Sequence, residues 1–421
     1  MGYNAAFPYL ERTLKSDLLF HLLLALAAVI ALGRALGALF RRLGQPPVIG
    51  EVVAGILLGP TLLGRIFPGG EAFLLPAAVS PLLGALAQLG VILYMFLVGL
   101  DLNAAEFKRK GKASFFISQA SIVLPFGMGL LLAFWLHPRF AEPGVPFLGF
   151  ALFIGVAMSI TAFPVLARIL GDSGMSRSAL GALALSCAAV DDATAWCLLA
   201  VAVGASSGEL DSAMAVGAWL LAFLALMIFA LRPLILKYAA RHSKAPLGQG
   251  VVATVLLGVL LSALATEWIG IHAIFGAFLL GVLVPHDSAI AREFEGKLKD
   301  VVAVLLLPAF FAYSGMRTEL GLLQGAEQWL ACGLIIAAAT AGKFGGATLA
   351  ARITGMGWRD ASALGILMNT RGLVELIVLN IGLDLKIISP TLYAMMVLMA
   401  LATTLATAPA LRCFTPGVLK K

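Results

Sequence analysis

Residues 147–170 read FLGFALFIGVAMSITAFPVLARIL, an apolar run whose middle contains Ser159, Thr161 and Pro164. About 20 mostly apolar residues are enough for a helix to cross the hydrocarbon core of a bilayer, so this run predicts a transmembrane segment. Proline lacks a backbone N–H and interrupts a helix, so Pro164 indicates a break near the middle of the membrane. An ordinary kink without functional meaning is the alternative interpretation.

The rest of the chain has the same apolar character. Of its 421 residues, 61% are hydrophobic and 12% are charged, whereas about 25% of the residues of a soluble domain are charged. This composition excludes a soluble protein and predicts a multi-pass protein of the cell membrane, which would be the inner membrane in a bacterium. The net charge of +7 comes from basic residues in short loops, so it does not predict a nucleic-acid partner. The four cysteines lack metal-ligand spacing, and no cofactor is expected.

Thirteen apolar runs are long enough to be candidate spans, which predicts an all-α polytopic membrane protein in contact with the lipid bilayer. They are 17–40, 47–66, 80–100, 113–136, 147–170, 178–204, 212–236, 248–268, 270–286, 300–317, 327–351, 359–383 and 388–411. Most of the 29 Lys and Arg residues fall in alternate loops between these runs. Because cytoplasmic loops collect basic residues, the alternation predicts an outside N-terminus and a cytoplasmic C-terminus.

The chain contains a weak internal repeat. The segment from Ile49 to Gly59 resembles that from Ile271 to Gly281, 95–101 resembles 311–317, and 155–161 resembles 365–371. The matches keep their order and pair spans of opposite orientation, which is typical of inverted-topology repeats in secondary transporters. The expected organisation is a single transport unit over 1–421. It comprises a first repeat at about 17–204, a linker helix at 205–247, a second repeat at 248–412 and a short cytoplasmic tail at 413–421.

The third pair of matching segments predicts two interrupted helices. The run 147–170 has Pro164 after its polar centre, and 359–383 contains Asn369, Thr370, Arg371 and Gly372 in apolar surroundings. Two opposed broken helices would aim helix dipoles and free carbonyl groups at one point, which suits a small cation.

Ionisable residues inside spans cost about 2.5–3.5 kcal/mol each on insertion scales, so each needs a reason. Arg34 lies near a predicted cytoplasmic end and can extend its charge to the interface, and Glu51 lies in the first turns of its span. The remaining five are candidate functional residues: Asp191, Asp192, Lys343, Arg371 and Glu375.

Asp191 and Asp192 lie at the middle of 178–204. Adjacent residues of a helix point about 100° apart, so the two carboxylates are expected to have different roles. Burial disfavours a charged carboxylate and a nearby cation favours it. A carboxylate balanced between these effects can bind either a proton or a metal cation, which is the competition that an exchanger needs. Two structural aspartates are the alternative.

Lys343 lies at the middle of 327–351, and a buried lysine needs a partner to keep its charge. One of the two aspartates is the expected partner, in a salt bridge that breaks when a cation binds or in a static structural pair. Arg371 and Glu375 are four residues apart on one helix and can form an ion pair with a gating or a structural role.

These residues lie in segments that resemble the monovalent cation:proton antiporter-2 family, especially the membrane domain of plant-type cation/H+ exchangers and of Kef-type potassium efflux proteins. The resemblance covers essentially all of 17–412. It is carried by PPVIGE at 46–51, SITAFPVLARIL at 159–170, VDDATAW at 190–196 and NTRGLVEL at 369–376.

The resemblance implies a homodimer whose protomers each have a dimerisation domain and a core domain with two crossed broken helices, and an elevator-like movement of the core. It implies that Asp192 binds the transported cation and the proton, with Asp191 beside it and Lys343 as the salt-bridge partner of Asp192. It also implies that Thr161 helps to ligate the ion, and Ser159 beside it is included in the expected binding site.

Two departures from the family pattern bear on function. Plant-type and Kef-type members often have a neutral residue before the key aspartate, whereas this chain has Asp191, as electrogenic sodium/proton antiporters of related families do. This difference favours Na+ over K+ as the ion exchanged for H+. The chain ends at Lys421, so no fused nucleotide-binding regulatory domain is expected.

The prediction is therefore a secondary active cation/proton antiporter, not an enzyme. The alternatives are a cation channel and a sodium-coupled solute transporter of the same fold. The sequence contains no TVGYG filter loop, which argues against the channel. Few polar groups lie at the predicted midplane of the membrane, which argues against transport of a larger solute. The sequence lacks the GxxxxGK[ST] motif, which excludes a nucleotide-driven pump. Asp191, Asp192 and Lys343 could all titrate, which suggests two protons per cation.

Overall fold

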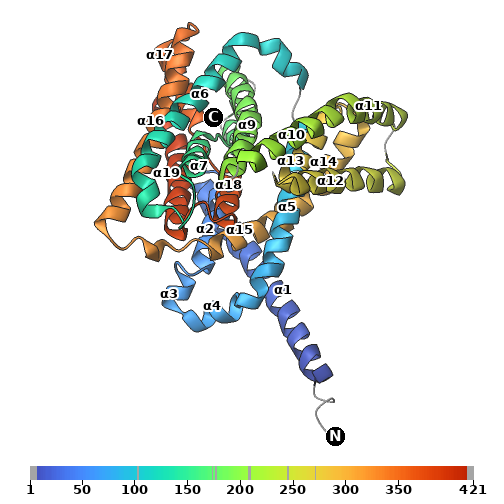
Figure 1. The fold of residues 1–421 in the computed structure, drawn as a ribbon, viewed down its shortest axis with the longest axis vertical. Helices are drawn as coiled ribbons and strands as arrows, with labels where there is room; N and C mark the ends of the chain where they lie inside the picture. The colour runs from blue at the N-terminus through green and yellow to red at the C-terminus, as the bar shows by residue number, and fades with distance from the viewer. Residues whose placement is uncertain are drawn as a thin grey trace. The chain divides into compact units, whose positions relative to one another are not determined.

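Apolar runs in a membrane fold into helices because every backbone N–H and C=O must be satisfied within the protein. The computed structural model describes residues 7–101, 104–172, 174–175, 178–206, 210–243, 246–270 and 272–414 (Figure 1). Across these ranges the regular elements are helices, with one isolated bridge between Ala141 and Ile388. The predicted all-α class is therefore confirmed.

The helices of the first half are α1 (Phe7–Arg42), α2 (Pro47–Leu58), α3 (Leu63–Ile66), α4 (Pro68–Leu74), η1 (Ala77–Val79), α5 (Ser80–Asp101), α6 (Ala104–Phe140), α7 (Phe147–Ser159), α8 (Phe163–Asp172) and α9 (Ala179–Ser206). The following helices are α10 (Leu210–Ala225), η2 (Leu226–Leu231), α11 (Arg232–Arg241), α12 (Gln249–Ile269), α13 (Ala273–Leu283) and α14 (Ala289–Val301). The last ones are η3 (Val302–Leu306), α15 (Leu307–Met316), η4 (Leu320–Leu322), α16 (Ala326–Ile353), α17 (Trp358–Met368), α18 (Leu373–Asp384) and α19 (Pro390–Phe414).

Among the described residues, ten helical segments are long and apolar enough to cross a membrane. The bent pair α17 and α18 makes an eleventh candidate. Two shorter apolar helices, α7 and α13, lie where the sequence predicts the fifth and ninth spans, but 13 and 11 residues are too few to cross a bilayer alone. The count of thirteen spans and the orientation of the termini therefore stay predictions.

The chain divides into two compact units. The first contains residues 1–43, 47–91 and 300–321. In it, α2 packs against α1 and α15, and small residues allow the close approach of α2 and α15. A Cβ atom on Gly59 would overlap the carbonyl of Gly315, and one on Gly55 would overlap the carbonyl of Phe311. These two helices are therefore in backbone contact.

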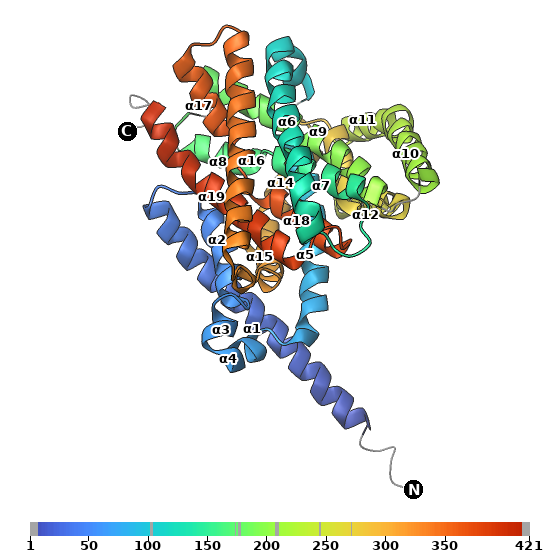
Figure 2. The ribbon, with the colours of Figure 1, turned by 60° about the vertical axis from the view of Figure 1, so that its left-hand side comes forward.

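The second unit contains residues 44–46, 92–299 and 322–421. In it, α6 and α16 run side by side and each packs against α7, and α9 packs against α6 and α7 (Figures 1 and 2). A Cβ atom on Gly281 of α13 would overlap the carbonyl of Phe96 on α5, and Gly99 faces Gly281 in return. The sequence pairs Gly59 with Gly281 and Gly99 with Gly315, so the same glycine contact occurs once in each unit.

Candidate functional site

Two helix breaks meet in the second unit. Residues 160–162 separate α7 from α8, and residues 369–372 separate α17 from α18, with a bend of 43°. The backbone N–H of Ala162 donates a hydrogen bond to the carbonyl of Thr370 at 2.9 Å, and the Thr161 hydroxyl lies 3.0 Å from the carbonyl of Met368. The two interrupted helices predicted from the sequence are therefore joined at their breaks.

Pro164 lies in the first turn of α8, after the break. A proline is tolerated there because the N–H groups of a first helical turn have no intrahelical partner. The interruption at 160–162 leaves the last carbonyls of α7 without intrahelical partners as well. The break therefore offers both free carbonyl groups and a helix N-terminus to groups placed beside it.

The side chain of Arg371 satisfies the carbonyl end of α7. Its guanidinium donates to the carbonyl oxygens of Ala157 at 2.8 Å and Met158 at 2.5 Å, and it forms a 3.0 Å ion pair with Glu375. Both charged side chains are fully buried. Arg371 and Glu375 thus form the predicted pair, and the positive charge lies at a helix C-terminus, where the helix dipole favours it. The backbone N–H of Arg371 donates a 2.9 Å hydrogen bond to the hydroxyl oxygen of Thr404 on α19.

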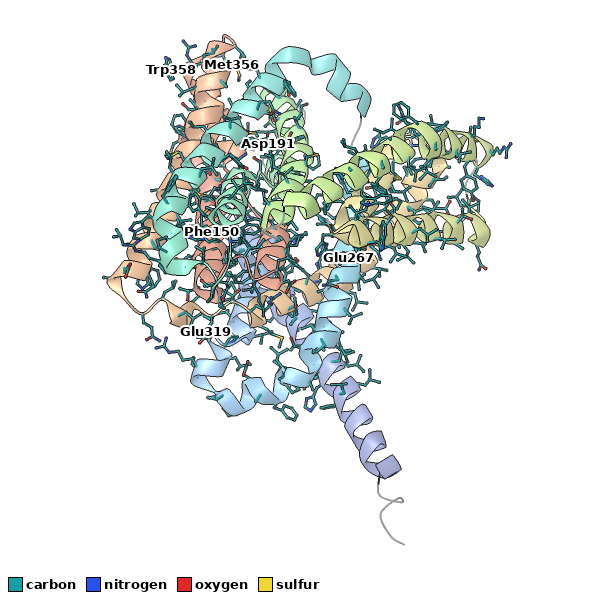
Figure 3. All side chains as sticks on the ribbon, in the orientation of Figure 1. Phe150, Asp191, Glu267, Glu319, Met356 and Trp358 are labelled. Atoms are coloured by element: carbon teal, nitrogen blue, oxygen red, sulfur yellow. The ribbon has the colours of Figure 1, made fainter. Side chains whose placement is uncertain are left out.

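Asp191 on α9 is fully buried inside the second unit (Figure 3), and hydrogen-bond donors from three other segments contact it. The hydroxyls of Ser118 and Ser121 on α6 lie 2.6 and 2.9 Å from its carboxylate oxygens, and that of Thr161 lies at 2.7 Å. The ammonium of Lys343 on α16 is 2.7 Å from Oδ2, in an ion pair without exposed surface. Both oxygens of Asp191 are therefore occupied by protein donors.

Asp192 is also buried, with 2% of its surface exposed, but its surroundings differ. It interacts with the backbone N–H of Phe163, in the first turn of α8. Its Oδ1 atom has no hydrogen-bond partner within the described structure, although the atom is buried. An unsatisfied buried carboxylate oxygen is costly, so binding of a proton or a cation at Oδ1 would be favourable.

The resemblance implied that Lys343 pairs with Asp192, and this implication is wrong in the structure. Lys343 pairs with Asp191. The two carboxylates project about 100° apart around α9, so the one that turns toward α6 and α16 meets Lys343 and the other does not.

Of the other two expected site residues, the side chain of Thr161 reaches an aspartate and that of Ser159 bonds within its own helix. Thr161 contacts Asp191, as described above, whereas the hydroxyl of Ser159 donates to the carbonyl of Val156 in its own helix at 2.8 Å. Ser118 and Ser121 were not predicted. Their signal was the spacing of Ser114, Ser118 and Ser121, which places three hydroxyls on one face of the mostly apolar run 113–136.

Comparisons with known proteins identify the family and the fold of the chain. A family model described as "Sodium/hydrogen exchanger, transmembrane" matches residues 2–413. The chain is 47% identical to the Na+/H+ antiporter NhaS4 of Synechocystis sp. over 396 residues, which cover 92% of this chain and 96% of that protein. A solved structure of the sodium proton antiporter MjNhaP1 from Methanocaldococcus jannaschii matches with a TM-score of 0.67 and 15% identity, over 96% of this chain and all of that chain, which shows a shared fold.

Longer relatives match over part of their length. The chain is 41% identical to Cation/H+ antiporter 20 of Arabidopsis thaliana over 404 residues and 35% identical to K+/H+ antiporter 1 of Saccharomyces cerevisiae over 383 residues. It covers 48% and 43% of those proteins, which in turn match 92% and 88% of this chain. The predicted family and the predicted multi-pass membrane location are confirmed. The chain belongs to the transmembrane sodium/hydrogen exchanger family, a family of membrane cation/proton antiporters.

Proposed function

We propose that the protein is a secondary active antiporter that exchanges Na+ for protons at Asp192. The observation that carries the proposal is the charge balance of the buried site. Lys343 balances Asp191, and Arg371 balances Glu375. In the described part of the site, Asp192 is the buried carboxylate without a salt-bridge partner.

An ionised carboxylate in this position needs a cation, because an isolated buried charge is strongly unfavourable. A proton and a sodium ion can each supply the positive charge, but they cannot both occupy the same oxygen. Binding of one therefore displaces the other, which is the coupling that antiport requires. The backbone N–H of Phe163 stabilises the ionised carboxylate of Asp192 after one of these ions has left and before the other has bound.

Asp191 has a different role in this proposal. With its oxygens held by Ser118, Ser121, Thr161 and Lys343, it fixes α9 against α6, α16 and the break after α7. Thr161 is a positioning residue for the ion site, and its hydroxyl can turn from Asp191 to the carbonyl of Met368. Ser159, the last residue of α7, is proposed to contribute to the ion site through its backbone carbonyl.

The choice of Na+ over K+ rests on the Asp191–Lys343 pair beside Asp192. The name of NhaS4 specifies Na+ and that of the yeast relative specifies K+, and identity to NhaS4 is higher. A stoichiometry of two protons per cation completes the proposal, with Lys343 releasing the second proton when its salt bridge opens.

The transport cycle is proposed to be an elevator-type movement within a homodimer, with thirteen spans, an outside N-terminus and inverted repeats at 17–204 and 248–412 joined by the linker helix. The glycine contacts support the repeats. In the sequence match, Gly59 corresponds to Gly281 and Gly315 corresponds to Gly99. The contact of Gly59 with Gly315 in one repeat pair therefore has its equivalent in the contact of Gly281 with Gly99. An inverted repeat predicts such a paired contact, whereas chance similarity of short apolar segments does not.

Reconstitution in liposomes with an internal pH dye tests the function. Addition of NaCl or KCl to one side of the membrane should move protons to that side, at lower concentrations of Na+ than of K+. A response to K+ alone would assign the other ion. Cation flux without proton movement would instead favour a channel, and a proton response that requires an organic solute would favour a solute transporter.

A further inference from the structure

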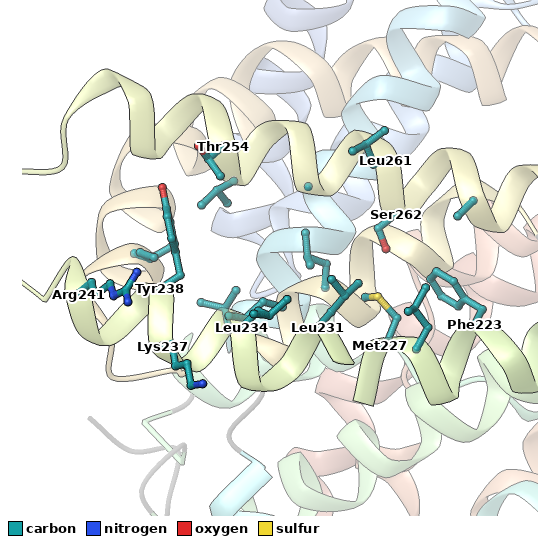
Figure 4. A pocket seen from close by; sticks show the side chains of 18 residues that line it. Phe223, Met227, Leu231, Leu234, Lys237, Tyr238, Arg241, Thr254, Leu261 and Ser262 are labelled. Atoms are coloured by element: carbon teal, nitrogen blue, oxygen red, sulfur yellow. The ribbon is translucent and has the colours of Figure 1, made fainter. Parts of the chain in front are cut away.

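A large cavity of the second unit lies away from Asp192, between the η2–α11 segment and α12 (Figure 4). Its volume is about 760 Å³, within the range of small-molecule sites. Residues of α13 and α14 complete the wall, including Leu280 and Ile290. The cavity therefore has room for an elongated ligand in contact with α10, the η2–α11 segment, α12, α13 and α14.

The two ends of this cavity differ in polarity. Lys237, Tyr238, Arg241 and Thr254 lie together at one end, and the opposite end is formed by apolar side chains such as Phe223 (Figure 4). Lys237 and Arg241 are four residues apart and share a helix face. The cavity is thus apolar along most of its length and cationic at one end.

The two basic side chains are free to bind an anion. Neither Lys237 nor Arg241 forms an ion pair with an acidic residue of the described chain. Two of the three acidic residues of the neighbouring α14 already have partners. Glu293 binds Lys297 and the backbone N–H of Leu247, and Glu295 binds Lys299.

The dimensions fit one acyl chain of a lipid leaflet. From Tyr238 to Met227 the helical segment extends roughly 15 Å, which is half of a hydrocarbon core of about 30 Å. Beyond the other end of the cavity, Trp219 of α10 and Trp268 of α12 meet edge to face with ring centroids 5.3 Å apart, and they are 54% and 71% exposed. Exposed tryptophans gather at membrane interfaces, so this helix pair has an aromatic boundary opposite its basic one.

The wall of the cavity contains an unusual element. Leu226–Leu231 forms a π-helix, and three of its residues, Leu226, Met227 and Leu231, line the cavity. π-Helical turns are rare and are often found at functional sites, because they displace the following side chains from the regular helical position. Here the turn separates the apolar part of the segment from α11, which carries Lys237 and Arg241.

We propose that this cavity binds an anionic phospholipid of the cytoplasmic leaflet. The phosphate lies between Lys237 and Arg241, the hydroxyl of Tyr238 faces the headgroup, and an acyl chain lies along Leu234, Leu231 and Met227. The proposed orientation places these basic residues on the cytoplasmic side, where anionic lipids attract clusters of Lys and Arg. The lipid would hold the linker helix against α12. This site is distinct from the exchange site at Asp192.

Native mass spectrometry of the purified protein with added phosphatidylglycerol or phosphatidylcholine of identical acyl chains tests the proposal. We expect retention of phosphatidylglycerol, and about thirtyfold weaker binding of it in the double variant Lys237→Gln/Arg241→Gln. The matched control is Arg41→Gln/Arg42→Gln, which removes the same charge from exposed positions at the end of α1 and should bind as the wild type does.

A second variant tests the tail site without changing charge. Ala265 lines the cavity, so Ala265→Phe should fill it and weaken phosphatidylglycerol binding while the basic pair remains. Equal retention of the two lipids, or unchanged binding in the double variant, would overturn the proposal. A loss of dimer instead of lipid in these variants would also overturn it, because a second copy of the chain would then be the occupant.

Discussion

The ammonium nitrogen of Lys343 lies 2.7 Å from Oδ2 of Asp191, and neither side chain has any exposed surface. This pairing leaves the adjacent carboxylate, Asp192, as the buried acid without a salt-bridge partner in the described site. Two neighbouring aspartates of one helix therefore have different electrostatic surroundings, because Asp191 has an ion-pair partner and Asp192 has none in the described site.

We expect Asp192→Asn to abolish sodium-driven proton movement. The amide keeps the size of the side chain but can neither be ionised nor bind a proton in competition with Na+. The measurement is the pH-dye response of proteoliposomes, and Asp360→Asn, an exposed carboxylate of α17, is the matched control with normal activity expected. Residual sodium-driven proton movement above the level of empty liposomes would place the exchange site elsewhere.

Removal of Lys343 should destabilise the protein by about 3–5 kcal/mol, because Lys343→Met leaves the charge of Asp191 buried and unpaired. The double variant Asp191→Asn/Lys343→Met should recover most of this loss. Thermal unfolding in detergent measures both effects. Lys297, whose side chain is 51% exposed in its pair with Glu293, provides the comparison, since Lys297→Met should change stability little. If the double variant is as unstable as Lys343→Met alone, the ion pair does not account for the loss.

Arg371→Lys should lower stability by about 2 kcal/mol although the charge is retained. A lysine cannot donate at once to the carbonyls of Ala157 and Met158 and to Glu375, so a carbonyl at the end of α7 loses its partner. The same unfolding measurement applies. A variant as stable as the wild type would show that the carbonyl end of α7 does not depend on the guanidinium.

Gly281→Ala and Gly59→Ala should each be strongly destabilising, because the added methyl group would overlap a backbone carbonyl of the facing helix. Gly333→Ala in α16 is the control. No atom lies near its Cβ position, and alanine favours a helix over glycine by about 1 kcal/mol. Comparable losses at Gly281 and Gly59, with none at Gly333, support the inverted repeat, whereas a tolerated methyl group at either repeat position contradicts the close contact.

Exchange of two protons per sodium ion predicts that an imposed membrane potential changes the rate. A potential of 100 mV contributes about 2.3 kcal/mol per net charge moved, compared with about 1.4 kcal/mol for one pH unit per proton. With sodium inside the liposomes, sodium efflux coupled to proton uptake should be faster at an inside-negative potential set by a potassium ionophore. Rates that are independent of potential would indicate electroneutral exchange.

Much of this molecule can be predicted from local sequence. The helix interruptions at 160–162 and 369–372 follow from polar residues, Pro164 and Gly372 in apolar runs, and the pair of Arg371 with Glu375 follows from a spacing of four residues. The lengths of α7 and α13 were not predicted, because hydropathy continues across a break or a loop and does not report where the helical hydrogen bonds end.

The sequence by itself determined that the chain is a membrane protein with buried ionisable residues at Asp191, Asp192, Lys343, Arg371 and Glu375, since the cost of charge in lipid makes such residues conspicuous in an apolar run. Only the tertiary structure decided which aspartate pairs with Lys343 and that Ser118 and Ser121 hold Asp191. These contacts join residues at least 70 positions apart in the chain. Packing of α9 against α6 and α7 sets the direction of each side chain, and no local pattern contains that information.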